Sequence, residues 1–96
     1  MWTITKDLIA EADAKPGTNR NAVGIVGPRN AKLTADEIKN HPDAVQFRMY
    51  DDDNELYYEG YLIGDEFAPL DAFGTPNAGC TRIDVYDKKA RKWVTV

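Results

Sequence analysis

The sequence predicts a small α+β domain, with a mostly antiparallel sheet of five or six short strands and one short helix at about residues 34–40. The first observation behind this prediction is a strand–turn–strand pattern. Apolar and polar residues alternate over residues 45–50, and a run rich in tyrosine follows at residues 55–63. Period-two alternation is typical of strands. The acidic residues 51–54 between them suit a tight turn, because short carboxylate and amide side chains bond to the local backbone.

The second observation is a helix start. Thr34 and Glu37 have the spacing of a capping box, in which each side chain binds the backbone amide of the other residue. Leu33 and Ile38 occupy the positions of a hydrophobic staple, in which two apolar side chains pack together at the start of a helix. Pro42 limits the helix to about two turns. Because so short a helix is not stable alone, we expect Leu33 and Ile38 to dock it on the sheet.

Four more segments carry strand patterns. They are residues 2–5, 22–27, 81–86 and 92–96, and the apolar segment 22–27 should be a buried strand. In the first of these, Trp2 and Ile4 should face the core, and in the last Trp93 should anchor it. The sheet could also close into a small barrel, and the pattern favours neither form.

Two other stretches have helical character. Residues 6–14 could form a short helix capped by Thr5 or Asp7, or an irregular segment that leads away from the first strand. Residues 67–74 could hold one helical turn that stops at Gly74.

Length and composition fit one globular domain spanning residues 1–96. Its 43% hydrophobic and 29% charged residues are ordinary for a globular protein and unlike those of a disordered or membrane protein. No apolar run approaches the ~20 residues that span a bilayer, and the start lacks the pattern of a secretory signal. The single cysteine excludes an internal disulfide framework. We therefore expect a cytoplasmic protein with no membrane contact.

Charge is distributed unevenly along the chain. The net charge of -4 argues against a nucleic-acid partner, because phosphate binding draws its affinity from Lys and Arg. Between Val45 and Cys80 the one base among many acids is Arg48, whereas bases outnumber acids after Thr81. The acidic middle fits a protein partner with a basic patch, although the same charges could serve only to keep the surface solvated.

The sequence predicts no metal site and no cofactor. The acidic run from Asp51 fails the EF-hand pattern, because its sixth position is Leu56 and its twelfth is Leu62, where glycine and glutamate are required. One cysteine and one histidine cannot supply a zinc site.

Catalysis would have to use Cys80, with His41 as base and Asp71 or Asp84 as the orienting residue. Such a thiol needs a pKa lowered by a nearby cation or helix start. Free cysteines more commonly behave as small buried hydrophobic residues. No catalytic residue is therefore assigned, and a small Cys80-dependent enzyme is kept as an alternative.

The strongest functional candidate is an acidic, tyrosine-bearing surface on the hairpin. If alternation runs through residues 55–63, the tyrosines at 57 and 61 share the face opposite the core with Glu59. Tyrosine combines a large contact area with a polar tip. Alternatively, the helix or residues 67–73 cover this face, and the tyrosines are a second layer of core. The candidate binding residues are Tyr50, Asp51, Asp52, Asp53, Glu55, Tyr57, Glu59 and Tyr61.

These observations favour a small non-enzymatic protein-binding module, such as an adaptor, inhibitor or regulator, whose partner carries a basic patch. Besides the Cys80-dependent enzyme, a further alternative is a structural subunit that forms a homo-oligomer through an exposed strand edge or the tyrosine face. The chain carries no set of residues that matches the signature of a known family.

Overall fold

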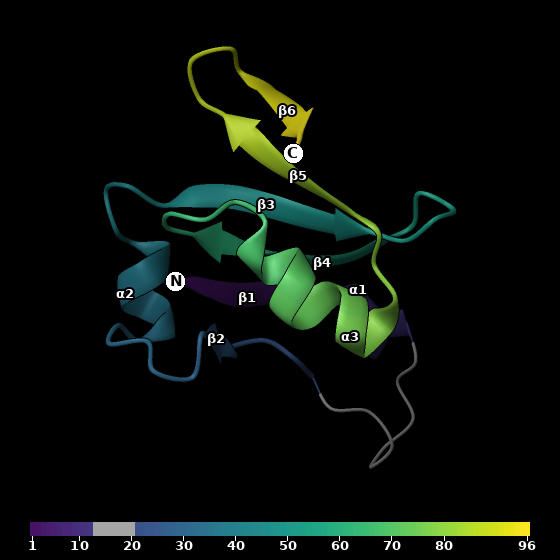
Figure 1. Cartoon of the computed structure of the whole chain (residues 1–96), viewed down its shortest axis with the longest axis horizontal. Helices are drawn as coiled ribbons and strands as arrows, with labels where there is room; N and C mark the ends of the chain where they lie inside the picture. The colour runs from purple at the N-terminus through teal and green to yellow at the C-terminus, as the bar shows by residue number, and fades with distance from the viewer. Residues whose placement is uncertain (13–20) are drawn as a thin grey trace.

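The computed structural model describes residues 1–12 and 21–96, and in them an antiparallel sheet of six strands (Figure 1). In sheet order these are β2 (Val26–Gly27), β1 (Trp2–Asp7), β4 (Leu56–Leu62), β3 (Val45–Tyr50), β5 (Arg82–Asp87) and β6 (Lys92–Thr95). The predicted α+β class is confirmed. Because β2 and β6 form two separate edges, the sheet is open and does not close into a barrel.

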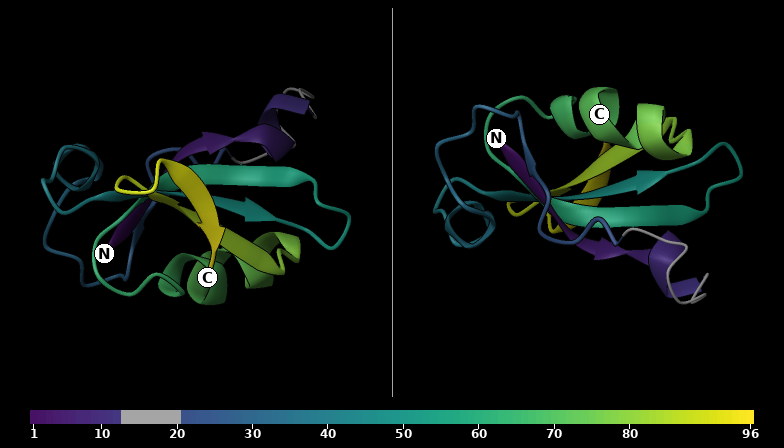
Figure 2. Two further views of the ribbon diagram at one scale, coloured as in Figure 1. Left: turned by 90° about the horizontal axis from the view of Figure 1, so that it is seen from above. Right: turned by 90° about the horizontal axis from the view of Figure 1, so that it is seen from below.

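The main core lies between one face of the sheet, the front face, and a helical segment that covers it. This segment comprises a π-helical turn, η1 (Leu70–Gly74), and a short helix, α3 (Thr75–Ala78). Both views of Figure 2 show it on one side of the sheet. The ring centroid of Phe73 lies 5.6 Å from that of Trp2 and 5.1 Å from that of Tyr58. Other buried members of this core are Ile4, Phe47, Met49, Leu62, Leu70, Cys80, Ile83 and Val85.

Helix α2 (Ala35–Lys39) begins as its sequence predicts. The amide of Glu37 donates to the Thr34 hydroxyl at 3.2 Å, and the amide of Thr34 donates to the Glu37 carboxylate at 3.0 Å. Ile38 is completely buried, and the helix lies against β1 and β4. The capping box and the docking role of Ile38 are therefore confirmed.

Helix α1 (Leu8–Ala12) follows directly from β1 and is capped by Asp7. The Asp7 carboxylate is only 3% exposed and accepts hydrogen bonds from the amides of Ala10 and Ala22, both at 2.9 Å. A carboxylate this buried needs such donors, because burying an unpaired charge is costly. Of the alternatives for residues 6–14, the helix capped by Asp7 is correct up to residue 12, and residues 13–14 lie outside the described part of the chain.

The predicted strand over residues 22–27 is mostly irregular. Only Val26 and Gly27 pair with β1, because Gly24 adopts a φ of 92° that turns the chain. Before Val26, the segment contacts β1 through individual hydrogen bonds and not through regular strand pairing. For example, the amide of Ile4 donates to the carbonyl of Ile25 at 3.1 Å. The apolar side chains of Val23 and Ile25 are exposed, so the prediction of a buried strand is wrong.

The helical turn predicted over residues 67–74 does not stop at Gly74. Gly74 has helical dihedral angles, and the helical segment ends at Gly79, whose φ of 67° is left-handed. A Cβ at Gly74 would lie 2.6 Å from the sulfur of Met49. Gly74 therefore serves close packing of the helical segment on the sheet, which local sequence does not reveal.

We expect Gly60→Ala to destabilise the fold. Gly60 lies in β4 between β1 and β3, and a Cβ there would overlap the carbonyl oxygen of Thr3 and lie 2.6 Å from the ring of Phe47. Because a backbone group cannot swing aside, the free energy of unfolding should fall by at least about 2 kcal/mol, measured by chemical denaturation. Gln46→Ala, at an exposed position of β3, should change it by less than about 0.5 kcal/mol. Equal stability of the two variants would contradict the close approach at Gly60.

Candidate functional site

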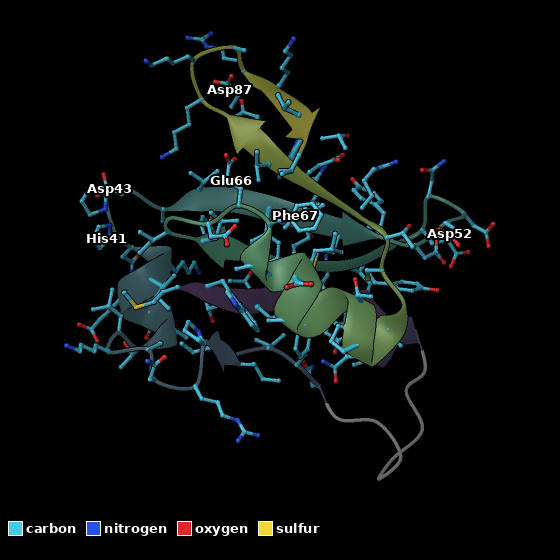
Figure 3. All side chains as sticks on the ribbon, in the orientation of Figure 1. His41, Asp43, Asp52, Glu66, Phe67 and Asp87 are labelled. Carbon is cyan, nitrogen blue, oxygen red and sulfur yellow. The ribbon has the colours of Figure 1, made fainter. Side chains whose placement is uncertain are left out.

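The β3–β4 turn, residues 51–55, is built around one carboxylate. Asp51 Oδ1 accepts hydrogen bonds from the amides of Asp53 and Glu55, both at 2.9 Å. Asn54 adopts the left-handed conformation, with φ of 62°, and its amide donates to the Asp51 carbonyl at 3.1 Å. This network fixes the turn, which extends beyond the helical segment in Figure 1. Figure 3 shows Asp52 at its tip.

The exposed carboxylates of this turn are those of Asp52, Asp53 and Glu55. None of the ion pairs formed among the described residues involves them. They therefore present a concentrated negative charge to solvent.

Tyr57 departs from the expected alternation because of a β-bulge. Met49 pairs with Tyr58 and Tyr50 pairs with Leu56, so Tyr57 is an extra residue in β4. It packs against the front-face core and does not share the back face with Tyr50. A hydrogen bond with the Asp51 carboxylate raises the pKa of Tyr57 to about 12. The pKa of Asp51 is lowered in turn, chiefly by the bond from the Glu55 amide and then by that from Tyr57.

A groove of about 880 Å³ opens beside this turn. Three elements that are distant in sequence form it: α1, the beginning of β4 and α3. Its lining residues are Leu8, Ile9, Glu55, Leu56, Tyr57, Asn77 and Ala78. Sequence analysis identified Glu55 and Tyr57 but missed the contributions of α1 and α3, because no local pattern indicates which segments meet.

The back face of the sheet, opposite the helical segment, carries a ladder of alternating charge. Glu59 lies 3.1 Å from the Nε of Arg48 and 4.0 Å from the Nζ of Lys6. Within β5, Arg82 Nε lies 3.2 Å from Asp84 Oδ1. Glu59, a predicted binding residue, is thus engaged with two cations inside the molecule.

Arginine–aromatic contacts complete this face. The guanidinium of Arg48 lies 4.1 Å above the ring of Trp93, and that of Arg82 lies 4.1 Å above the ring of Tyr50. Trp93 also meets Tyr86 edge-on, with centroids 5.4 Å apart. Trp93 is therefore a half-buried back-face residue and not the core anchor that its size suggests.

The predicted binding residues thus form two groups. The turn and groove bring together Asp51, Asp52, Asp53, Glu55 and Tyr57, whereas Tyr50, Glu59 and Tyr61 lie on the back face. Tyr61 is half-buried between β1 and β3, opposite Thr3 and Gln46. Residues 67–73 cover the front face, so they do not cover these back-face tyrosines.

The residues considered for catalysis do not come together. Cys80 is completely buried in the front-face core, and burial raises the pKa of its thiol to about 11. His41 follows α2 at the other end of the sheet from α3, where its Nδ1 accepts the amide of Asp43 at 3.0 Å (Figures 1 and 3). Asp84 lies on the back face and accepts a hydrogen bond from the Thr95 hydroxyl at 2.7 Å. Asp71 is exposed.

No family model, curated protein or solved structure matches this chain. Within residues 1–12 and 21–96, no three side chains of the His, Cys, Asp and Glu types are grouped closely enough to hold a metal ion. The helices of the described residues are all too short to cross a membrane.

We expect Asp51→Ala to loosen the turn and lower the midpoint of thermal unfolding, because two backbone amides lose their acceptor. The pKa of Asp51 lies below its usual value in the folded state, so its stabilisation is present at neutral pH and lost as the pH falls through that lowered pKa. Asp52→Ala, at an exposed position, is the matched control and should leave the midpoint unchanged. A larger loss in the control than in Asp51→Ala would contradict this account.

The Cys80 thiol should react slowly with a thiol reagent in the folded protein. Its pKa rises from 9.0 to about 11, which alone lowers the thiolate fraction near neutral pH about a hundredfold, and burial blocks access further. Labelling at pH 8 should therefore be at least about a hundredfold slower in the native protein than in denaturant. Native labelling as fast as that of a free cysteine would restore the enzyme hypothesis.

Proposed function

We propose that this protein is a non-enzymatic protein-binding module that uses the acidic turn 51–55 together with the adjoining groove. The observation behind this proposal is that three exposed carboxylates stand beside a hollow with mostly apolar walls. Complementary charge steers association and selects the partner, while apolar burial supplies much of the affinity. The partner that fits is a protein segment that presents Lys or Arg next to an apolar side chain.

The rigidity of the turn supports this proposal. The Asp51 carboxylate holds two amides of the turn, and Glu55, at the end of the turn, is itself one of the residues that line the groove. A preorganised site loses less conformational freedom on binding, so more of its contact energy appears as affinity. Asp51 therefore has a positioning role in the proposed site, and Asp52, Asp53 and Glu55 supply the charge.

The back-face residues contribute less to the proposal. Glu59 and Tyr50 already have arginine partners within the molecule, and a partner protein would have to compete with those contacts. The enzyme alternative is also weaker, because the thiol it requires is buried. A single reduced cysteine accords with action in the cytoplasm, which we propose as the location.

Reversing the charge of the turn should abolish binding. The test variant carries Asp52→Lys, Asp53→Lys and Glu55→Lys and leaves Asp51 intact, so the turn retains its network. Immobilised wild type and variant would be exposed to lysate of the producing cell, and the retained proteins quantified by mass spectrometry. The expected result is a basic partner that wild type retains and the variant loses.

Two further variants make this test specific. Asp36→Lys with Glu66→Lys and Asp71→Lys changes the net charge equally at exposed positions elsewhere, and it should retain the partner. Asn77→Trp fills the groove without changing charge and should weaken binding. Equal loss in the control variant, or full binding by Asn77→Trp, would overturn the proposed site.

A further inference from the structure

The sheet has an open edge at β6, far from the acidic turn (Figure 1). Among the described strands β6 pairs only with β5. The amide of Val96 donates to the carbonyl of Ile83 at 3.1 Å. Because backbone groups of an antiparallel strand alternate in direction, those of Val94 and Val96 face β5, and those of Trp93 and Thr95 face the open edge. Such an outward row of donors and acceptors can pair with another strand.

The front side of this edge is apolar and uncovered. Val94 and Val96 are 38% and 47% exposed. Beside them lies a hollow of about 440 Å³ whose apolar walls are Pro42, Ala44, Val45, Val85 and Val94. A strand added at β6 would place every second side chain over this strip and the hollow.

The turn that precedes β6 is basic. Lys88, Lys89, Arg91 and Lys92 are all exposed. Asp87 Oδ1 accepts the amides of Lys89 and Ala90, at 2.9 and 3.1 Å, and so fixes the turn. Asp43, Glu66 and Asp87 line the hollow as well, so its own charge is mixed. The net positive charge lies along the turn and the beginning of β6.

We propose that β6 is the docking edge for an extended acidic segment of another protein, which adds to the sheet as a further strand. Its backbone would pair with Trp93 and Thr95, its apolar side chains would lie over Val94 and the hollow, and its carboxylates would meet the basic turn. An acidic partner is favoured over a second copy of this edge because two positively charged edges repel each other. This surface is separate from the acidic turn, and the inference does not depend on the function proposed above.

The test uses a fluorescent ten-residue peptide in which valine alternates with glutamate, with binding followed by anisotropy. We expect it to bind, and to shift the amide resonances of Trp93 and Thr95. Thr95→Pro removes one outward amide and should weaken binding at least about tenfold. Thr95→Ala keeps that amide, loses the hydroxyl bond to Asp84, and should bind like wild type.

A second pair of variants addresses the charge and does not touch the strand. Lys88→Glu with Lys89→Glu and Lys92→Glu should also weaken peptide binding at least about tenfold. The matched control reverses three exposed cations elsewhere, Arg29, Lys32 and Lys39, and should leave binding unchanged.

Four results would each overturn the proposal. The first is equal binding by Thr95→Pro and wild type, and the second is equal binding of a peptide in which valine alternates with lysine. The third is tighter binding of a single-stranded oligothymidylate, which would make the basic turn a nucleic-acid site. The fourth is a concentration-dependent dimer, seen by light scattering and abolished by Thr95→Pro, which would assign the edge to a second copy.

Discussion

The central strand β4 imposes the constraint on which the rest of the structure depends, because it pairs with β1 on one side and β3 on the other. Its side chains can point only to the front or the back. At Gly60 the neighbouring strand and the ring of Phe47 leave no room for a side chain, so Phe47 fills that part of the front face. Tyr58 and Leu62 then flank it, and the ring of Phe73 packs against Tyr58. The position of the helical segment follows from this packing.

Most of the back face is covered by no helix and is therefore exposed to solvent. Antiparallel sheets tolerate such a wet face when its side chains are polar. Arg48 on β3 contacts Glu59 on β4 and Trp93 on β6, and Arg82 contacts Asp84 and Tyr50. Each partly exposed ion pair contributes only about 0–1 kcal/mol, yet together they occupy charges and rings that would otherwise be free to bind. This explains why the back-face half of the predicted surface is the weaker candidate.

Features fixed by a few neighbouring residues could be predicted from the sequence, and features fixed by register could not. The capping box of α2 and the acidic turn each depend on contacts within four residues. The face of Tyr57 depends on a single-residue bulge, which no local pattern signals. Trp93 and Val94 are both apolar, and only the pairing of Val94 with Val85 decides which of them faces front. The groove needs α1, β4 and α3 together, and their meeting is a property of the whole fold.

The acidic turn after β3 and the basic turn after β5 are stabilised in the same way, although their exposed charges are opposite. Asp51 and Asp87 each direct one carboxylate oxygen at two amides of the following turn. Each turn also contains one left-handed residue, Asn54 with φ of 62° and Arg91 with φ of 55°. Stiff turns hold exposed charges at fixed positions, which reduces the entropy that a binding partner must overcome. Because the two turns lie at different corners of the sheet (Figure 1), the basic partner and the acidic partner that we propose would meet separate electrostatic fields. The two proposals together require this separation, since adjacent turns of opposite charge would neutralise each other.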